Sequence, residues 1–259
     1  MFPILWIVSS AFKDKMHVLS YPPTFVFSPT LDAFRAVFSY PKGSGVYFWH
    51  FFQGSVVVSL LTAVGVILIS FPAAYSIARL RFHGRSTILF IILATRMVPP
   101  MAMLVPLYLF ASNIGILDTY LALVITYLAI GTPLATWILV GFIQNVDVEI
   151  EEAAFLDGCT KFQMFIRILL PLVAPGIVVV SFIAFLLAWN DYTMASVLTV
   201  QRTRTVTILA MMFIAPSEEG NLIAQMGAVA TLVMIPPILY IFFAQRYLRS
   251  GIGLGSLKG

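Results

Sequence analysis

Charged residues are scarce in this 259-residue chain. Asp, Glu, Lys and Arg together make up 10% of the sequence, whereas hydrophobic residues make up 60%. Soluble globular domains carry about 25% charged residues, so an ordinary soluble fold is excluded. The few charges are also unevenly placed, because four long stretches contain none: residues 43–78, 119–146, 168–190 and 220–245.

Each of these four stretches is long enough to cross a membrane, since about 20 helical residues span the hydrocarbon layer. Residues 87–110 also qualify if one arginine, Arg96, is tolerated. The alternation typical of lipid-facing barrel strands is missing, and backbone amides in lipid must bond within their own segment. The sequence therefore predicts an all-α polytopic membrane protein with spans near 54–78, 87–110, 120–144, 168–190 and 222–245.

Residues 1–12 are apolar but would reach only about 18 Å as a helix. No basic residues precede them and the charged run 13–15 follows, which does not fit a cleaved signal peptide. We expect this segment to be the outer part of a first helix that begins further upstream. The chain is then one domain, residues 1–259, with six spans. The apolar stretch 205–217 is too short to cross and fits an interfacial or re-entrant segment.

The sequence has a single cysteine and lacks the common phosphate-binding loop. Cys159 is the one cysteine, so no disulfide can form within the chain. No GxxxxGK[ST] phosphate loop occurs, and no pair of histidines or carboxylates stands at metal-ligand spacing within a span. The sequence therefore predicts no covalent chemistry, no metal site and no bound cofactor. The pattern of positive charge does not favour nucleic acid as a partner.

The basic residues indicate how the chain is oriented. Three arginines crowd the short connection 79–85, and three basic residues lie in the tail 246–259. Short basic loops mark the cytoplasmic side of a membrane, which also places the connection 145–167 inside and the segment 13–53 outside. We therefore expect both termini in the cytoplasm.

The densest acidic cluster lies in the connection 145–167. The stretch EIEEAAFLDGCTKFQMFIRILLP begins at Glu149 and has four acids up to Asp157. Asp147 can cap a helix that begins near residue 148, where negative charge suits the helix dipole. Apolar residues then recur at helical spacing: Phe155, Leu156, Cys159, Phe162 and Phe165.

We interpret residues 148–165 as a short amphipathic helix that enters the groove of a partner protein. Ala153 and Ala154 keep part of its surface thin, and Gly158 allows a turn or a close approach. The alternative is an interfacial helix that lies on lipid. The acids argue against this alternative, because the anionic cytoplasmic leaflet repels them.

The spacing in this segment resembles a family signature. Glu152-Ala153-Ala154, three residues, Gly158, nine residues and then Ile168-x-Leu170-Pro171 is similar to the EAA motif of the permease subunits of bacterial ABC importers. The resemblance implies the type I importer permease fold, in which this loop is the coupling helix that seats in a cleft of the ATP-hydrolysing subunit.

The resemblance also implies roles for single residues. Glu152 would face a basic group of the ATPase, Ala153 and Ala154 would allow close contact, and Gly158 would form the turn. The implied docking set is Glu151, Glu152, Ala153, Ala154, Phe155, Asp157 and Gly158.

Three further stretches resemble the carbohydrate-uptake branch of these permeases, specifically its maltose-type second permease. They are AYSIARLRFHGR at 74–85, AWNDY at 188–192 and GIGLGSLKG at 251–259. The resemblance implies a start upstream of residue 1 and a tail that reaches the ATPase dimer, with Gly255 and Lys258 in contact. A frayed terminus is the alternative for the tail.

Arg96 is a charged residue at membrane depth, where such groups usually face a cavity or a partner. It could line the solute pathway and donate hydrogen bonds to sugar hydroxyls, or it could pair with a neighbouring helix or snorkel. Asn190 and Asp191 are a second candidate set for sugar contact, with an interfacial aromatic anchor at this position as the alternative. Asn113 and Gln225 are weaker candidates for the same pathway.

Prolines are frequent within or at the edges of the spans, with pairs at 99–100 and 236–237. Each proline removes a backbone donor and kinks its helix. Bent helices that rock to open the pathway on alternate sides are one interpretation. The simple abundance of proline in membrane helices is the other.

The sequence therefore predicts a permease subunit of an ATP-driven importer in the bacterial inner membrane, forming half of the pathway for a sugar, polyol or related solute. The implied partners are a second homologous permease, two ATPase subunits, an external solute-binding protein and membrane lipid. ATP and Mg²⁺ would bind to the ATPases and not to this chain. An ion-coupled secondary transporter and an ABC permease for a non-carbohydrate solute stay open as alternatives.

Overall fold

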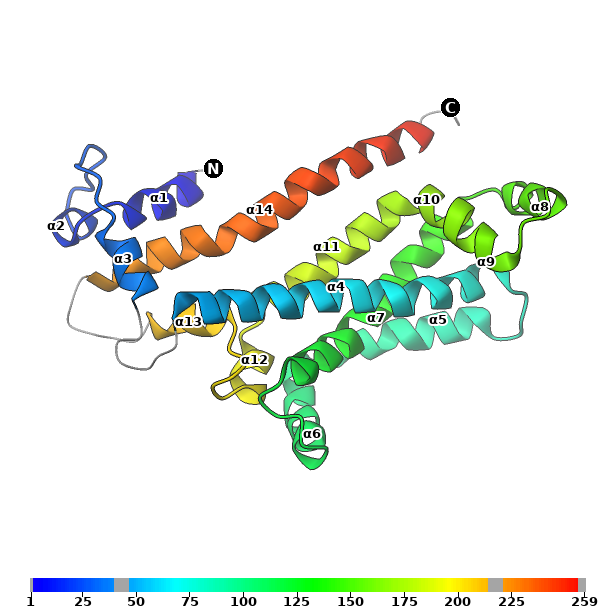
Figure 1. The fold of residues 1–259 in the computed structure, drawn as a ribbon, viewed down its shortest axis with the longest axis horizontal. Helices are drawn as coiled ribbons and strands as arrows, with labels where there is room; N and C mark the ends of the chain where they lie inside the picture. The colour runs from blue at the N-terminus through cyan, green and yellow to red at the C-terminus, as the bar shows by residue number, and fades with distance from the viewer. Residues whose placement is uncertain (1, 40–46, 214–220, 256–259) are drawn as a thin grey trace.

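The structure, a computed structural model, describes residues 2–39, 47–213 and 221–255. Every regular element within these ranges is helical, as the composition predicts. Long helices run along the longest axis of the molecule (Figure 1). Short helices lie at both ends of the molecule, with α8 (Val148–Leu156) at one end and α2 (Lys15–Val18) at the other.

Three helices within the described ranges are long and apolar enough to cross a membrane. They are α4 (Phe48–Arg79), α7 (Tyr120–Gln144) and the part Ile223–Gln245 of α14 (Asn221–Gly255). The bounds of α7 match the predicted span 120–144. Helix α4 begins at Phe48 and not near residue 54, and α14 continues well past residue 245.

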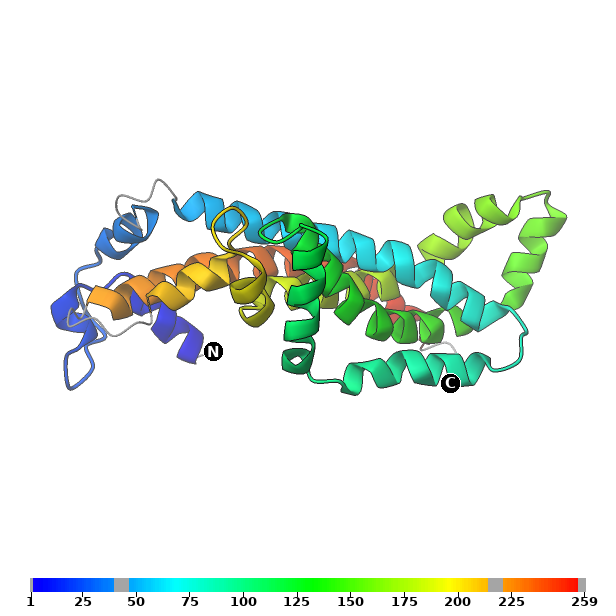
Figure 2. The same cartoon turned by 90° about the horizontal axis from the view of Figure 1, so that it is seen from below.

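The predicted span 87–110 is broken into two helices near its proline pair. Helix α5 (Arg85–Ala94) and the short turn Thr95–Met97 are separated from α6 (Pro100–Asn113) by a bend of 92°, which is visible in Figure 2. Val98 and Pro99 are extended at this break. Proline lacks an N–H and disfavours helical backbone in the residue before it, so the proline pair ends one helix and starts the next.

The predicted span 168–190 is also bent, and helical structure starts earlier. Lys161–Leu172 and Ala174–Asn190 meet at 77°. The first arm contains α9 (Lys161–Met164), a π-helical segment (Phe165–Leu169) and α10 (Leu170–Leu172), and the second arm is α11 (Ala174–Asn190). Pro171 and Pro175 flank the bend and leave carbonyl groups one turn earlier without their helical donors.

If each bent pair is one span, the described residues hold up to five crossings. Helix α1 (Phe2–Ala11) is a shorter apolar helix that packs along α14, so a total of six stays a prediction. The second proline pair, at 236–237, lies inside the continuous helix α14. The predicted short apolar segment 205–217 contains α13 (Val206–Met212), which packs on α4 and α14.

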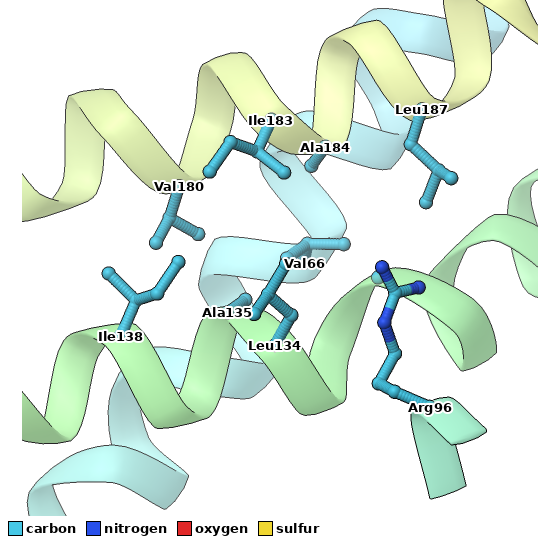
Figure 3. Close-up of a pocket in the computed structure, with 10 residues that line it drawn as sticks. Val66, Arg96, Leu134, Ala135, Ile138, Val180, Ile183, Ala184 and Leu187 are labelled. Atoms are coloured by element: carbon cyan, nitrogen blue, oxygen red, sulfur yellow. The ribbon is translucent and has the colours of Figure 1, made fainter. Parts of the chain in front are cut away.

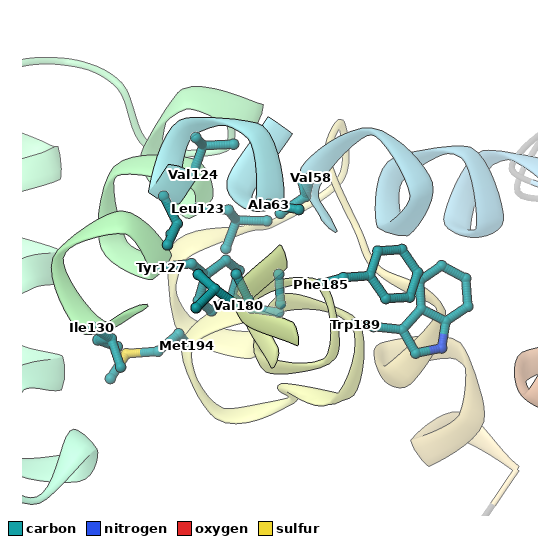
Figure 4. Close-up of a cluster of buried hydrophobic side chains, with 14 of the residues drawn as sticks. Val58, Ala63, Leu123, Val124, Tyr127, Ile130, Val180, Phe185, Trp189 and Met194 are labelled. Carbon is teal, nitrogen blue, oxygen red and sulfur yellow. The ribbon is translucent and has the colours of Figure 1, made fainter. Parts of the chain in front are cut away.

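The core lies where α4, α7 and α11 meet (Figure 4). Ser55, Ser59 and Thr62 of α4 are fully buried, and such small residues let helix backbones approach closely in membranes. Trp189 of α11 is also fully buried. Its indole N–H donates to the carbonyl of Val233 at 3.2 Å, so it ties α11 to α14.

Candidate functional site

Helix α8 is shorter than predicted. The expected helix 148–165 is instead two helices, α8 and α9, and Gly158 lies between them with a φ of +85°. Asp147 stands at the N-cap position but its side chain makes no capping hydrogen bond. The amphipathic face expected along the whole segment therefore does not exist, because the chain turns after Leu156.

Two capping motifs form this turn. The N–H of Cys159 donates to the carbonyl of Ala154 at 3.0 Å, and the N–H of Gly158 donates to Phe155 at 3.1 Å. This pair of bonds is a Schellman motif, which favours glycine at the left-handed position. Thr160 and Gln163 then form a capping box that starts α9. The predicted turn at Gly158 is confirmed.

Helix α8 presents two different faces. Glu151 and Ala154 are 5% exposed, so both point into the protein. The other five residues of the implied docking set are exposed: Glu152, Ala153, Phe155, Asp157 and Gly158. Leu156 is 89% exposed beside them. The inward positions of Glu151 and Ala154 do not fit their implied places on a docking surface.

Glu151 is held by the C-terminal end of α4. Arg79 donates from Nε to Glu151 Oε1 at 2.6 Å and from Nη2 to the carbonyl of Val146 at 2.7 Å. The hydroxyl of Tyr75 donates to Glu151 Oε2 at 3.3 Å. The side chains of Arg79 and Glu151 are 10% and 6% exposed. We call these four groups, on Tyr75, Arg79, Val146 and Glu151, the Arg79 cluster.

A second carboxylate, that of Asp118, binds a loop at the N-terminal end of α7, far along α7 from the Arg79 cluster. Asp118 lies just before α7 and has a φ of +56°. Its carboxylate accepts hydrogen bonds from the backbone N–H groups of residues 200–203 at 3.0–3.3 Å. Partial burial alone raises the pKa of Asp118, but these N–H groups, Arg202 foremost, outweigh it and lower the pKa to about 2. The loop after α12 (Thr193–Leu198) is thereby fixed to the start of α7.

Arg96 borders a small apolar cavity between α7 and α11 (Figure 3). Its Nη1 donates to the carbonyl of Ile130 at 2.9 Å. The cavity of about 40 Å³ is lined otherwise by apolar residues and Gly131. Ligand pockets usually have volumes of about 300–1,000 Å³, so this cavity is too small for a sugar. The geometry shows a structural bond for Arg96, and its role in a pathway stays a prediction.

Asn190 and Asp191 have different surroundings. Asn190 is exposed. Asp191 Oδ2 accepts from the Tyr127 hydroxyl at 2.9 Å and from the N–H of Met194 at 2.9 Å, and the Asp191 carbonyl accepts from Thr207 at 2.9 Å. Asp191 therefore joins α7, α12 and α13, which favours a structural role. Solute contact by either residue stays a prediction.

The remaining predicted residues do not share one element. Asn113 is exposed at the end of α6, and Gln225 is half-buried in α14. Gly255 is the last residue of α14, whereas Lys258 lies outside the described residues. Within the described ranges, no three His, Cys, Asp or Glu side chains are grouped as metal ligands.

The sequence does not predict the partners of Glu151 and Asp118. In the sequence, Arg79 is one of three arginines that indicate a cytoplasmic connection, and Tyr75 carries no signal of its own. The two residues are four positions apart and so share one face of α4, which was the available signal. Their partner Glu151 is 72 positions away from Arg79, and a single sequence does not indicate a pairing over that distance. The same holds for Asp118 and its loop.

The fold and the site define a multi-pass α-helical membrane protein with a two-faced helix at one end of the bundle. Residues 66–253 match the family "Binding-protein-dependent transport system inner membrane component", and the chain belongs to this family. It is therefore a transport subunit of the importer permease type.

Curated relatives span nearly the whole chain. A probable ABC transporter permease protein, y4oR, of Sinorhizobium fredii is 36% identical over 100% of this chain and 90% of its own length. The trehalose transport system permease protein SugB of Mycobacterium tuberculosis is 30% identical over 99% and 92%. The structure of a bacterial ABC transporter involved in alginate import has a TM-score of 0.78 at 21% identity, covering 95% of this chain and 90% of that chain. This last likeness confirms the importer permease fold.

Proposed function

We propose that the chain forms half of the translocation pathway of an ATP-driven importer for a sugar, polyol or related solute. Family membership and the likeness to a trehalose permease support this cargo class. A second homologous permease would supply the other half, and an external binding protein would deliver the solute. Both termini would lie on the cytoplasmic side of the bacterial inner membrane.

The observation that carries the proposal is the outer face of α8. Glu152, Ala153 and Leu156 are exposed there, at one end of the bundle (Figure 1). A helix that combines a carboxylate, a methyl-sized surface and a bare leucine is suited to a groove with a basic rim and an apolar floor. The opposite face of the same helix is fixed to α4, so force applied to α8 reaches the bundle.

An ATPase subunit would receive this face, and a second ATPase would serve the partner permease. ATP and Mg²⁺ would bind to the ATPases, which would carry out the hydrolysis. Closure of the ATPase pair would displace α8 and shift the bent helices between inward-open and outward-open arrangements. Gly255 and Lys258 would add a contact from the C-terminal tail.

Co-purification of the assembled complex tests the docking. Glu152→Lys reverses the charge of the outer face, and we expect it to lower the amount of bound ATPase and its hydrolysis rate at least about tenfold, which corresponds to roughly 1.4 kcal/mol. Gln201→Lys is the matched control, because Gln201 is exposed near the opposite end of α7. Equal ATPase binding in the two variants would contradict the proposal.

Uptake by the wild-type complex tests the transport class and the cargo. We expect ATP-dependent uptake of a labelled sugar or polyol in proteoliposomes that contain the external binding protein. Uptake driven by an ion gradient through this chain alone would instead identify a secondary transporter. Binding of only non-carbohydrate solutes by the external protein would overturn the cargo class and leave the importer assignment in place.

A further inference from the structure

The inner face of α8 is attached to α4 through charged and polar groups. Within the described residues, Arg79–Glu151 is the only ion pair that joins two separate helices. The bonds of the Arg79 cluster reach three parts of the chain. They hold Glu151 on α8, Val146 in the segment before α8, and Tyr75 and Arg79 on α4.

A requirement for stability alone does not explain this choice of residues. Removing two charges from water is costly, and well-packed apolar side chains of similar size often give equal or greater stability than a buried ion pair. Hydrogen bonds from a planar guanidinium differ from apolar contacts because they fix direction as well as distance. The cluster therefore sets the orientation of α8 relative to α4.

Aromatic contacts bring the next segment onto the same part of α4. Phe165 lies 4.5 Å from Phe71 and 5.4 Å from Tyr75, measured between ring centroids. Tyr75 thus contacts Glu151 with its hydroxyl and Phe165 with its ring. The chain before and after the exposed turn of α8 is clamped to about two turns of α4.

Helix α4 extends from this clamp to the opposite end of the bundle. Near its start, the hydroxyl of Ser55 accepts a hydrogen bond from the N–H of Val206 in α13 at 2.8 Å. Between these two points α4 packs along α7 and α11. A displacement of α8 that is passed to α4 is therefore passed to the centre of the bundle and to the far loops.

We propose that Arg79 and Glu151, with Tyr75, are positioning residues that make α8 and α4 move as one body, so that movement of an ATPase reaches the membrane helices through α4. This inference rests on the proposed docking of α8 to an ATPase. The role of the Arg79 cluster is to prevent α8 from turning on its own axis while its outer face is pushed.

The experiment measures the amount of solute taken up per ATP hydrolysed by the assembled transporter in proteoliposomes with its binding protein. Glu151→Gln keeps the size of the side chain and removes its charge. The double variant Arg79→Met, Glu151→Leu removes both charges and leaves no unpaired ion in the protein. Arg81→Gln is the matched control, since Arg81 is exposed two positions from Arg79.

We expect Glu151→Gln to lower uptake per ATP several-fold while the ATPase subunits remain bound through the outer face of α8. The double variant should regain thermal stability, yet its uptake per ATP should stay low. Arg81→Gln should keep the wild-type ratio. If Glu151→Gln does not fold, the double variant carries the test by itself.

Two results would overturn the inference. One is a wild-type ratio in both cluster variants, and the other is a double variant that recovers the ratio together with stability, because the pair would then serve the fold alone. Failure of the proposed function gives a different result. In that case the wild-type chain does not retain an ATPase, and no ratio can be measured for any variant.

Discussion

At one end of α7 the carboxylate of Asp118 holds the loop that follows α12, and near the other end the carboxylate of Glu151 holds α8 against α4. Both acids lie in connections between long helices. Asp118 binds four successive backbone N–H groups, of residues 200–203. Glu151 binds two side chains on a distant helix, Arg79 and Tyr75.

The two attachments differ in how they respond to substitution of the residues that donate the hydrogen bonds. A backbone N–H remains whatever side chain its residue carries, so substitutions in the loop 200–203 leave the bonds to Asp118 in place unless proline is introduced. The hold on Glu151 depends on the side chains of Arg79 and Tyr75, and only the Arg79 guanidinium carries a charge. The loop at one end therefore tolerates side-chain changes in residues 200–203, whereas the attachment at the other end loses its ion pair when Arg79 alone is replaced.

The largest effect is expected when Arg79 is replaced. Arg79→Leu leaves the buried carboxylate of Glu151 without its ion pair, and the loss of one partner of such a pair costs about 3–5 kcal/mol. We expect the free energy of unfolding in detergent, followed by intrinsic tryptophan fluorescence, to fall by that amount. Arg81→Leu should stay within about 0.5 kcal/mol of wild type, as exposed substitutions usually do. Equal losses in the two variants would show that the Arg79 cluster adds no more to stability than an exposed arginine does.

The sequence predicted these helices better than it predicted the attachments. Helix α7 was found with correct bounds because a charge-free run ends at Asp118 on one side and Asp147 on the other. The turn at Gly158 was found because glycine suits a left-handed residue. Both features depend on residues that are close together in the chain.

The direction of Glu151 could not be found in this way. Glu149, Glu151 and Glu152 look alike in sequence, and a helix of nine residues places them on different faces. Which face is turned inward depends on Arg79, whose distance in sequence hides the pairing. The 92° bend at Pro99 could not be predicted from sequence either. Two prolines predict that a helix ends there, but not the angle at which the next helix starts.

An intermediate effect is expected at the other end of α7, and it depends on pH. The pKa of Asp118 is lowered from 3.8 to about 2, so its charged form is favoured in the folded state. Its contribution is fully present well above the unfolded pKa and is lost as the pH falls from about 4 through about 2. The shift corresponds to at most about 2–3 kcal/mol, and less because the carboxylate is partly exposed.

Asp118→Asn isolates that contribution, because asparagine tolerates a positive φ and keeps one acceptor oxygen. We expect wild type to exceed this variant by about 1–2 kcal/mol in unfolding free energy near pH 6, and the difference to shrink toward pH 2.5. Thermal unfolding of both proteins across this range measures it. A difference that does not change with pH would mean that the charge of Asp118 is not what holds the loop.

The smallest effect compares two glycines in matching turns. Gly158 after α8 and Gly115 after α6 have φ values of +85° and +72°, and no atom lies within 4 Å of a Cβ built at either position. Each N–H donates to the residue three positions earlier, at 3.1 Å in both turns. Alanine at either site adds only the strain of a left-handed backbone, about 1–2 kcal/mol.

We therefore expect Gly158→Ala and Gly115→Ala to lower the unfolding free energy equally, within about 0.5 kcal/mol of each other. Their effects on function should differ. Gly158 lies in the exposed turn that follows α8, so its variant should bind less ATPase in the assembled complex. Gly115 lies near Asp118, away from the proposed docking surface. The prediction fails if the two variants differ in unfolding free energy but bind equal amounts of ATPase. The two turns would then differ in backbone strain and not in what they contact.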